Sequence, residues 1–273
     1  MYTYAMKTQK TIIAALFCLT LFACATSQTA GKANPFFFSK YGKTIRPPQV
    51  NKSTADAKLE LSFALVDSKN TALAKLVHSV MYNGLTPKQY ADKIIESSKQ
   101  DYLKDVEGME INPEWIYMFQ REYKEQHHVD ITGSYAVISR SIYEYLGGAH
   151  GYTGISCHVF DMDTLEHLSL NDIITGTGFS RLMPLVMTEL RLYSERETGR
   201  RMGPNDRLSS GGLYQTDTIE LQQWFPAEEG LCFFWNPYEI ASYADGHIFV
   251  TVSWNNLQGI LSARGETLAK TYR

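Results

Sequence analysis

Alternating apolar positions mark several strands along this chain. Residues 59–65 place Leu59, Leu61 and Phe63 at every second position, which is the period of a strand with one buried face. Thr132 and Gly133 lie between two such alternating runs, so that pair predicts an antiparallel hairpin. The other strand-like runs lie at residues 115–128, 135–146, 154–161, 219–225, 231–235 and 248–254.

Apolar residues at helical spacing predict three longer helices and one short helix. Asn70, Thr86 and Ser180 each precede such a stripe and are good helix caps, while Asn255 begins a short stretch that ends near Leu261. The order is strand, two helices, three strands, one helix and further strands. Because helices do not alternate one-for-one with strands, we expect an α+β fold, an antiparallel sheet with helices packed mainly on one face.

The N-terminus has the layout of a targeting segment. Translation starts at Met1 or Met6, and lysines then precede an apolar stretch that is too short to span a bilayer. This stretch ends in the letters LFAC, which resemble a bacterial lipobox with Cys24 as the acylated residue. Cleavage before Cys24 and addition of acyl chains such as palmitate would anchor the protein to a membrane. An ordinary secretory signal with an incidental cysteine is the alternative.

Composition changes sharply after this segment. The next stretch is rich in Ser, Thr, Lys, Asn, Gly and Pro, which is typical of a tether, although aromatic residues near Phe36 interrupt it and could pack onto the domain. The predicted organisation is a signal peptide at 1–23, a tether at 24–57, and one α+β domain at 58–273, with halves at 58–140 and 141–273.

Charge and cysteine content narrow the function classes. The net charge of −3 argues against a general nucleic-acid binder, which needs a broad basic surface. Beyond the signal peptide and Cys24, only Cys157 and Cys232 remain. A disulfide between them and two buried free thiols are both compatible with their positions in apolar runs.

The segment GGAHG, with Gly148 and His150, is the most distinctive cluster in the chain. Its glycines allow left-handed backbone conformations, which favours a tight structural corner between two strands. A ligand-binding or proton-transfer site at His150 is the second interpretation. His127 and His128 are adjacent on a strand and therefore point to opposite faces, so we expect no metal site and no cofactor. Asp161 is a candidate carboxylate partner for His150, but a solvated turn is the favoured interpretation, because Asp is common in turns.

The chain resembles a bacterial extracytoplasmic family, domain of unknown function 3298, which commonly follows a companion, domain of unknown function 4163. The resemblance rests on the GGAHG corner with Tyr145, on the turn and LSLND segment at 163–172, and on the downstream stretch YEIASYADG, which contains Tyr238 and Glu239. It spans roughly residues 59–261. Leu165 stands where the family often has glycine, and Ser242 where it often has proline.

The resemblance implies an α+β domain outside the cytoplasmic membrane, found in relatives within lysozyme-sensing anti-sigma factors and peptidoglycan deacetylases. We therefore expect a lipid-anchored binding or sensor domain of the cell envelope, whose ligand is a lysozyme-like protein or peptidoglycan. The resemblance favours a non-enzymatic role over a catalytic one. The candidate ligand-binding residues are Tyr145, Gly148, His150, Tyr238 and Glu239. An envelope enzyme that uses His150 with a carboxylate, and a purely structural lipoprotein, are the alternatives. We also expect the GGAHG and YEIASYADG segments to be neighbours in one sheet.

Overall fold

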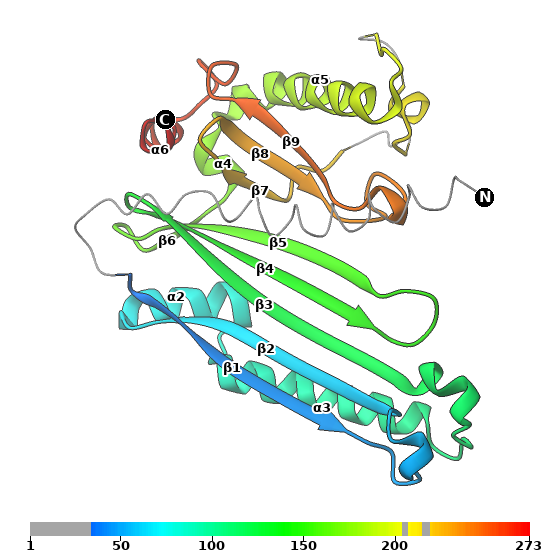
Figure 1. The fold of residues 1–273 in the computed structure, drawn as a ribbon. Helices are drawn as coiled ribbons and strands as arrows, with labels where there is room; N and C mark the ends of the chain where they lie inside the picture. Colours follow the sequence, from blue (N-terminus) through cyan, green and yellow to red (C-terminus); the bar gives the residue numbers. More distant parts are fainter. Residues whose placement is uncertain (1–33, 204–206, 215–218) are drawn as a thin grey trace.

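The strands form two separate sheets in the computed structural model, which describes residues 34–203, 207–214 and 219–273 (Figure 1). All neighbouring strands run antiparallel except β2 and β3, which are parallel. The α+β class predicted from the sequence is confirmed. The larger sheet has the order β1 (Phe36–Ile45), β2 (Lys58–Ser68), β3 (Gln120–Thr132), β4 (Tyr135–Tyr145), β5 (Tyr152–Asp161) and β6 (Glu166–Leu168).

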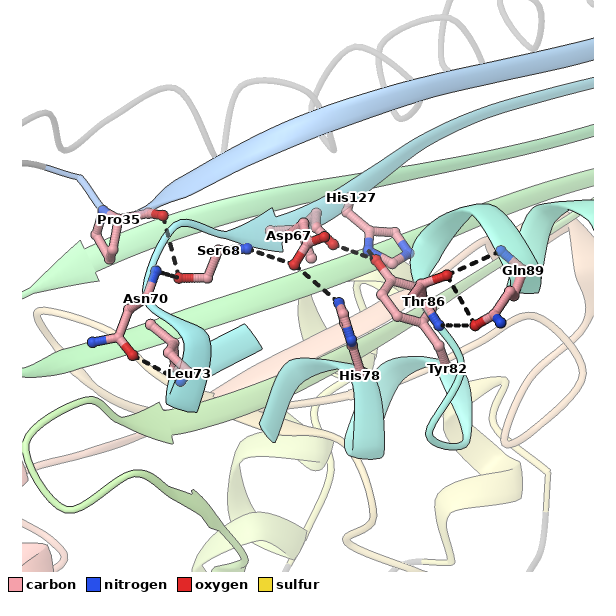
Figure 2. A network of polar contacts seen from close by, with 11 residues as sticks. Pro35, Asp67, Ser68, Asn70, Leu73, His78, Tyr82, Thr86, Gln89 and His127 are labelled. Atoms are coloured by element: carbon pink, nitrogen blue, oxygen red, sulfur yellow. Dashed lines mark hydrogen bonds and ion pairs between the residues drawn. The ribbon is translucent and has the colours of Figure 1, made fainter. Parts of the chain in front are cut away.

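Two helices connect the parallel strands β2 and β3 and pack on one face of the six-stranded sheet. Helix α2 (Thr71–Tyr82) begins at Asn70, whose side chain accepts the N–H groups of the first turn. Helix α3 (Pro87–Asp105) begins at Thr86, which forms a reciprocal capping box with Gln89 (Figure 2). Each cap satisfies backbone donors that a helix start leaves unpaired. Both caps were visible in the sequence.

The C-terminal part of the chain forms a second layer. Helix α5 (Phe179–Thr198) lies against the smaller sheet (Figure 1), and its buried stripe belongs to the same core as β8 and β9. The order of this sheet is β7-β8-β9. Its elements and the helices around it are β7 (Trp224–Pro226), β8 (Gly230–Trp235), β9 (Ile248–Ser253), α4 (Leu170–Ile173) and α6 (Ala263–Tyr272).

Strands β4 and β5 separate two hydrophobic cores. Val137 and Val159 face the core shared with the smaller sheet, whereas Ile138 and Phe160 face the core under α2 and α3. Since successive strand residues point to opposite faces, both faces of this part of the sheet are buried. The two layers are therefore joined where the first residues of β4 pair with the last residues of β5.

Residues 113–119 contradict the strand predicted at 115–128. They form a 3₁₀ helix, η2 (Pro113–Phe119), and β3 begins only at Gln120. The side chain of Asn112 accepts the N–H of Glu114, and proline at the first helical position has the required φ. This local chemistry outweighs the apolar alternation, and Trp115 is exposed rather than buried in a sheet.

The two ends of the domain also differ from expectation. Strand β1 occupies part of the stretch assigned to a tether, because Phe36 and Ile45 bury their side chains in the core under α3. At the other end, the predicted helix at 255–261 is a series of turns. The terminal helix is α6, which begins after Ser262, whose Oγ accepts the N–H of Gly265 at 3.0 Å.

The predicted signal peptide at 1–23 and the lipidation residue Cys24 lie outside the described residues. Within the described ranges, no helix combines the length and apolar character needed to cross a bilayer.

Candidate functional site

The corner between β4 and β5 has a backbone that requires glycine. Gly147 and Gly148 have φ values of 88° and 108°, in the left-handed region. A Cβ on Gly147 would also lie 3.2 Å from the carbonyl oxygen of Met118 in η2, so the corner packs closely on that helix. The hydroxyl of Tyr145 donates to the carbonyl oxygen of Gly148 at 3.0 Å and closes the corner.

His150 connects this corner to the smaller sheet. Its ring stacks on the ring of Tyr243, with centroids 4.1 Å apart and an interplanar angle of 18°. The hydroxyl of Tyr243 donates to the carbonyl oxygen of Gly151 at 2.7 Å, and Nδ1 of His150 lies 3.1 Å from the same oxygen. Because that carbonyl only accepts, Nδ1 carries the proton of this hydrogen bond, and Nε2 is left free to contact a ligand.

The GGAHG and YEIASYADG segments are therefore spatial neighbours, as predicted. They do not share one sheet, however. The corner joins two strands of the six-stranded sheet, whereas the segment containing Tyr238 and Tyr243 joins β8 to β9 of the smaller sheet. The prediction of a common sheet is wrong, because the two segments meet as loops through the His150–Tyr243 stack and not through a strand ladder.

Tyr238 and Glu239 lie beside this stack and have different roles. Tyr238 has a φ of 73° and its side chain is 54% exposed, with its ring centroid 5.7 Å from that of Tyr243. Glu239 accepts hydrogen bonds from the backbone N–H and the side-chain amide of Asn236, at 2.9 and 3.1 Å. Asn236 in turn binds both the N–H and the carbonyl oxygen of Ile155 in β5, at 2.7 and 3.1 Å. Glu239 thus orients the residue that fastens the β8–β9 loop to β5.

Several exposed aromatic residues near this corner were missed as site residues in the sequence. The rings of Trp115 and Tyr117 in η2 have centroids 6.1 Å apart, and η2 is the helix on which Gly147 packs. Tyr152, at the start of β5, is exposed, and partial burial together with the nearby carboxylate of Glu239 raises its pKa. Apolar alternation placed Trp115 in a strand, but Asn112 and Pro113 are a typical helix start, which was a signal that Trp115 lies on a short helix instead. We name the group Trp115, Tyr117, His150, Tyr152, Tyr238 and Tyr243 the aromatic corner surface.

The structure separates the proposed acid–base pair of His150 and Asp161. His150 lies just before β5 and Asp161 is the last residue of that strand, which for ten residues means a separation of about 30 Å. Asp161 is buried and accepts the N–H groups of Asp163 and Thr164 at 3.0 and 3.1 Å, as in a turn. Asp161 is therefore a turn residue, as predicted, but it is buried rather than solvated, and it does not pair with His150.

A second polar group lies inside the molecule between the sheet and helices α2 and α3. Glu125 on β3 is completely buried and accepts hydrogen bonds from Tyr90, Tyr123, His127 and Arg140. Burial alone would raise the pKa of Glu125, but the hydrogen bonds from His127 and Arg140 outweigh it and hold that pKa at about 2. These contacts satisfy the carboxylate fully, which is typical of a structural network.

Histidines 127 and 128 point to opposite faces, as expected for neighbours on a strand. His127 is buried and stacks on Tyr82 of α2, while His128 is exposed and binds Asp130. Figure 2 shows the contact between His127 and Tyr82. In the same view, Asp67 at the end of β2 binds His78 of α2 at 2.9 Å. These contacts attach α2 to the sheet.

The two remaining cysteines are free. Cys157 on β5 and Cys232 on β8 are both buried and belong to the same hydrophobic core. Burial raises the pKa of both thiols, to about 12 for Cys232, so neither is present as a reactive thiolate at neutral pH. The sequence left open a disulfide or two buried free thiols, and the structure has the buried free thiols.

Comparison with known proteins agrees with the predicted resemblance. Residues 187–255 match the family model described as "Protein of unknown function (DUF3298)", so the chain carries a DUF3298 domain there. This match includes the YEIASYADG segment, whereas the GGAHG corner precedes it. No curated protein matches the chain.

Two solved structures have a similar fold. One is a DUF3298 family member from Bacteroides fragilis, with a TM-score of 0.69 and 18% identity, covering 87% of this chain and 96% of that protein. The other is a DUF3298 family protein from Pseudomonas aeruginosa, with a TM-score of 0.56 and 13% identity, covering 84% of this chain and 96% of that protein. At these identities the likeness is one of fold.

Proposed function

We propose that this DUF3298-containing chain is a lipid-anchored, extracytoplasmic binding domain of the bacterial cell envelope. In this proposal Cys24 carries the lipid, and the aromatic corner surface binds a cell-wall glycan. Binding alone is proposed, without catalysis, because the corner brings His150 onto an aromatic ring and away from its candidate carboxylate Asp161.

The observation that carries the proposal is the exposure of large aromatic rings around a fixed corner. Tyr238 and Trp115 are 54% and 53% exposed, and Tyr152 is also exposed. Flat rings suit the apolar faces of sugar rings, and side chains with only two χ angles lose little entropy on binding. Nε2 of His150 and the tyrosine hydroxyls supply the few polar groups that fix a ligand's orientation.

A sedimentation experiment with purified peptidoglycan tests the glycan ligand. The soluble fragment from Ser27 onward should co-sediment with peptidoglycan, and Tyr238→Ala should weaken binding about tenfold because one stacking ring is lost. Phe38→Ala is the matched control, since Phe38 is 44% exposed on β1, an edge strand outside the corner. No sedimentation of the wild-type fragment, or equal loss in both variants, would contradict the proposal.

A lysozyme-like protein is the second candidate ligand. The same corner exposes Met118 and Leu146, two aliphatic side chains that a sugar does not need but a protein partner would cover. A pull-down of the same fragment against lysozyme distinguishes the two ligands. Capture of lysozyme that Tyr238→Ala removes, without peptidoglycan binding, would favour the protein ligand.

The lipid anchor has a separate test. Cys24→Ser removes the sulfur that would be acylated, so the protein should move from the membrane fraction to the soluble fraction. Cys18→Ser, which changes a cysteine inside the signal segment, should leave the distribution unchanged. An unchanged distribution for Cys24→Ser would disprove lipidation at that residue.

A further inference from the structure

Two histidines from neighbouring strands face each other at the edge of the six-stranded sheet. His158 lies on β5 and His167 on β6, the last strand in the sheet order. Nδ1 of His158 is 3.2 Å from Nε2 of His167, and their ring centroids are 5.2 Å apart. Phe160 pairs with His167 in the ladder, so His158, two residues earlier, points to the same face. We propose that this pair binds a divalent transition-metal ion such as Zn²⁺ or Cu²⁺.

The distance between the two nitrogens suits a shared metal ion. In a tetrahedral site with metal–nitrogen distances of about 2.05 Å, two ligand nitrogens lie about 3.3 Å apart. The observed separation between His158 and His167 is 3.2 Å, so an ion can replace their hydrogen bond while the two nitrogens keep their spacing, and each ring tilts to point its lone pair at the ion. The ring that donated the hydrogen bond moves its proton to its other nitrogen, and both rings stay neutral.

The surrounding charges are nearly balanced. Arg140 on β4 is the cationic group that acts on His158, the ring of His127 on β3 also lies near it, and Asp172 is the anionic group that acts on His167. The charge of Arg140 is offset by Glu125, since its Nε lies 2.7 Å from a carboxylate oxygen. Arg140 therefore imposes only a modest electrostatic cost on binding a metal ion.

The site is open rather than closed. In the described part of the chain, no set of three or more His, Cys, Asp or Glu side chains is arranged to hold a metal ion. Two imidazoles and water would thus complete the coordination, and the exposed ring of His167 gives water access. Imidazole ligands suit Cu²⁺, Ni²⁺ and Zn²⁺, with Cu²⁺ bound most tightly in the usual order. Binding should be weaker than in a closed structural zinc site.

Isothermal titration of the full-length, untagged protein with Zn²⁺ after removal of metals by EDTA tests this site. The wild-type protein should bind one ion, and His158→Gln and His167→Gln should each raise the Kd at least about tenfold. Electron paramagnetic resonance of the Cu²⁺ complex should show coordination by two nitrogens, and by one fewer in either variant.

His128→Gln is the matched control, because His128 is an exposed histidine on β3 that points to the opposite face from His127. It should bind Zn²⁺ as the wild type does. His167 is exposed, so His167→Gln should fold normally, which circular dichroism would verify. A wild-type protein that binds no Zn²⁺, or variants that bind it unchanged, would overturn the proposal. The outcome is independent of glycan binding at the aromatic corner surface.

Discussion

At the scale of single residues, Glu125 combines complete burial with hydrogen bonds from four other side chains. It lies on β3 with no exposed surface, and its partners come from α3, β3 and β4. Removing one member of a buried ionic network leaves another charge without compensation, which is more costly than the net value of the pair. The network therefore ties α3 to the sheet, and its removal should be felt as lost stability.

We predict that Glu125→Gln lowers the free energy of unfolding by about 3 kcal/mol near pH 7, because Arg140 loses its anionic partner. The pKa of Glu125 is lowered when folded, from 4.5 to about 2, so its stabilisation is complete above the unfolded value and is lost as the pH falls. The difference between wild type and variant should shrink between pH 4.5 and pH 2. Urea unfolding at a series of pH values measures it.

Glu60→Gln is the control for this change, since Glu60 is an exposed residue on β2 that pairs with Lys58 at the surface. Its stability should stay within about 0.5 kcal/mol of the wild type at every pH. A Glu125→Gln protein as stable as Glu60→Gln would show that the network contributes nothing.

Two residues depart from the family pattern, and the structure gives a reason for each. Leu165, where the family often has glycine, has a φ of 56°, so the backbone there does require the left-handed region. Its side chain packs against the core under α2 and α3, which accounts for a residue other than glycine. Ser242, where the family often has proline, donates its N–H to Asp245 at 3.0 Å, a bond that proline could not make.

At the scale of elements, α6 shows how close contact can override intrinsic preference. A Cβ built on Gly265 would lie 2.2 Å from the carbonyl oxygen of Ile173 in α4. Glycine is a poor helix former, yet only glycine lets α6 approach α4 this closely. The position of the terminal helix is therefore set by packing against α4 as much as by its cap at Ser262.

We expect Gly265→Ala to lower the free energy of unfolding by about 2–3 kcal/mol, because the backbone of α4 cannot move aside cheaply. This loss outweighs the gain of about 1 kcal/mol that alanine brings to a helix interior. Gly176→Ala, at a glycine with open space around its Cβ position, should be close to neutral. Thermal unfolding of Gly265→Ala and Gly176→Ala measures this difference in stability. Equal stability of the two variants would contradict the packing argument.

The elements that the sequence predicted well are those with local chemical signals. Asn70 and Thr86 cap their helices through side-chain bonds that any reader of the sequence could expect. Apolar alternation predicted a strand at Trp115, where the flanking residues instead start a 3₁₀ helix. The polar composition around Phe36 predicted a tether, where the chain instead forms strand β1. Alternation reports which residues are apolar, but pairing partners decide whether a segment joins a sheet.

At the scale of the whole molecule, the corner surface is made by two sheets that meet through loops. His150 stacks on Tyr243, and Asn236 binds the backbone of Ile155, across separations of 93 and 81 residues respectively. The family resemblance suggested that these segments are neighbours, but no local pattern predicts which side chains touch at such distances. The bonds of Asn236 to Ile155, together with the bond from Tyr243 to Gly151, hold the aromatic corner surface in one arrangement.

We predict that Asn236→Ala loosens this junction without unfolding the protein. The N–H of Ile155 loses its acceptor, so hydrogen exchange in the peptide containing it should accelerate, while peptides from α2 and α3 should exchange as before. Peptidoglycan binding should weaken by about tenfold, because Tyr238 and Tyr243 lie on the released loop. Asn255→Ala, at an exposed asparagine after β9, should change neither property. Faster exchange throughout the chain would mean general destabilisation instead, and unchanged exchange at Ile155 would show that Asn236 does not hold the two sheets together.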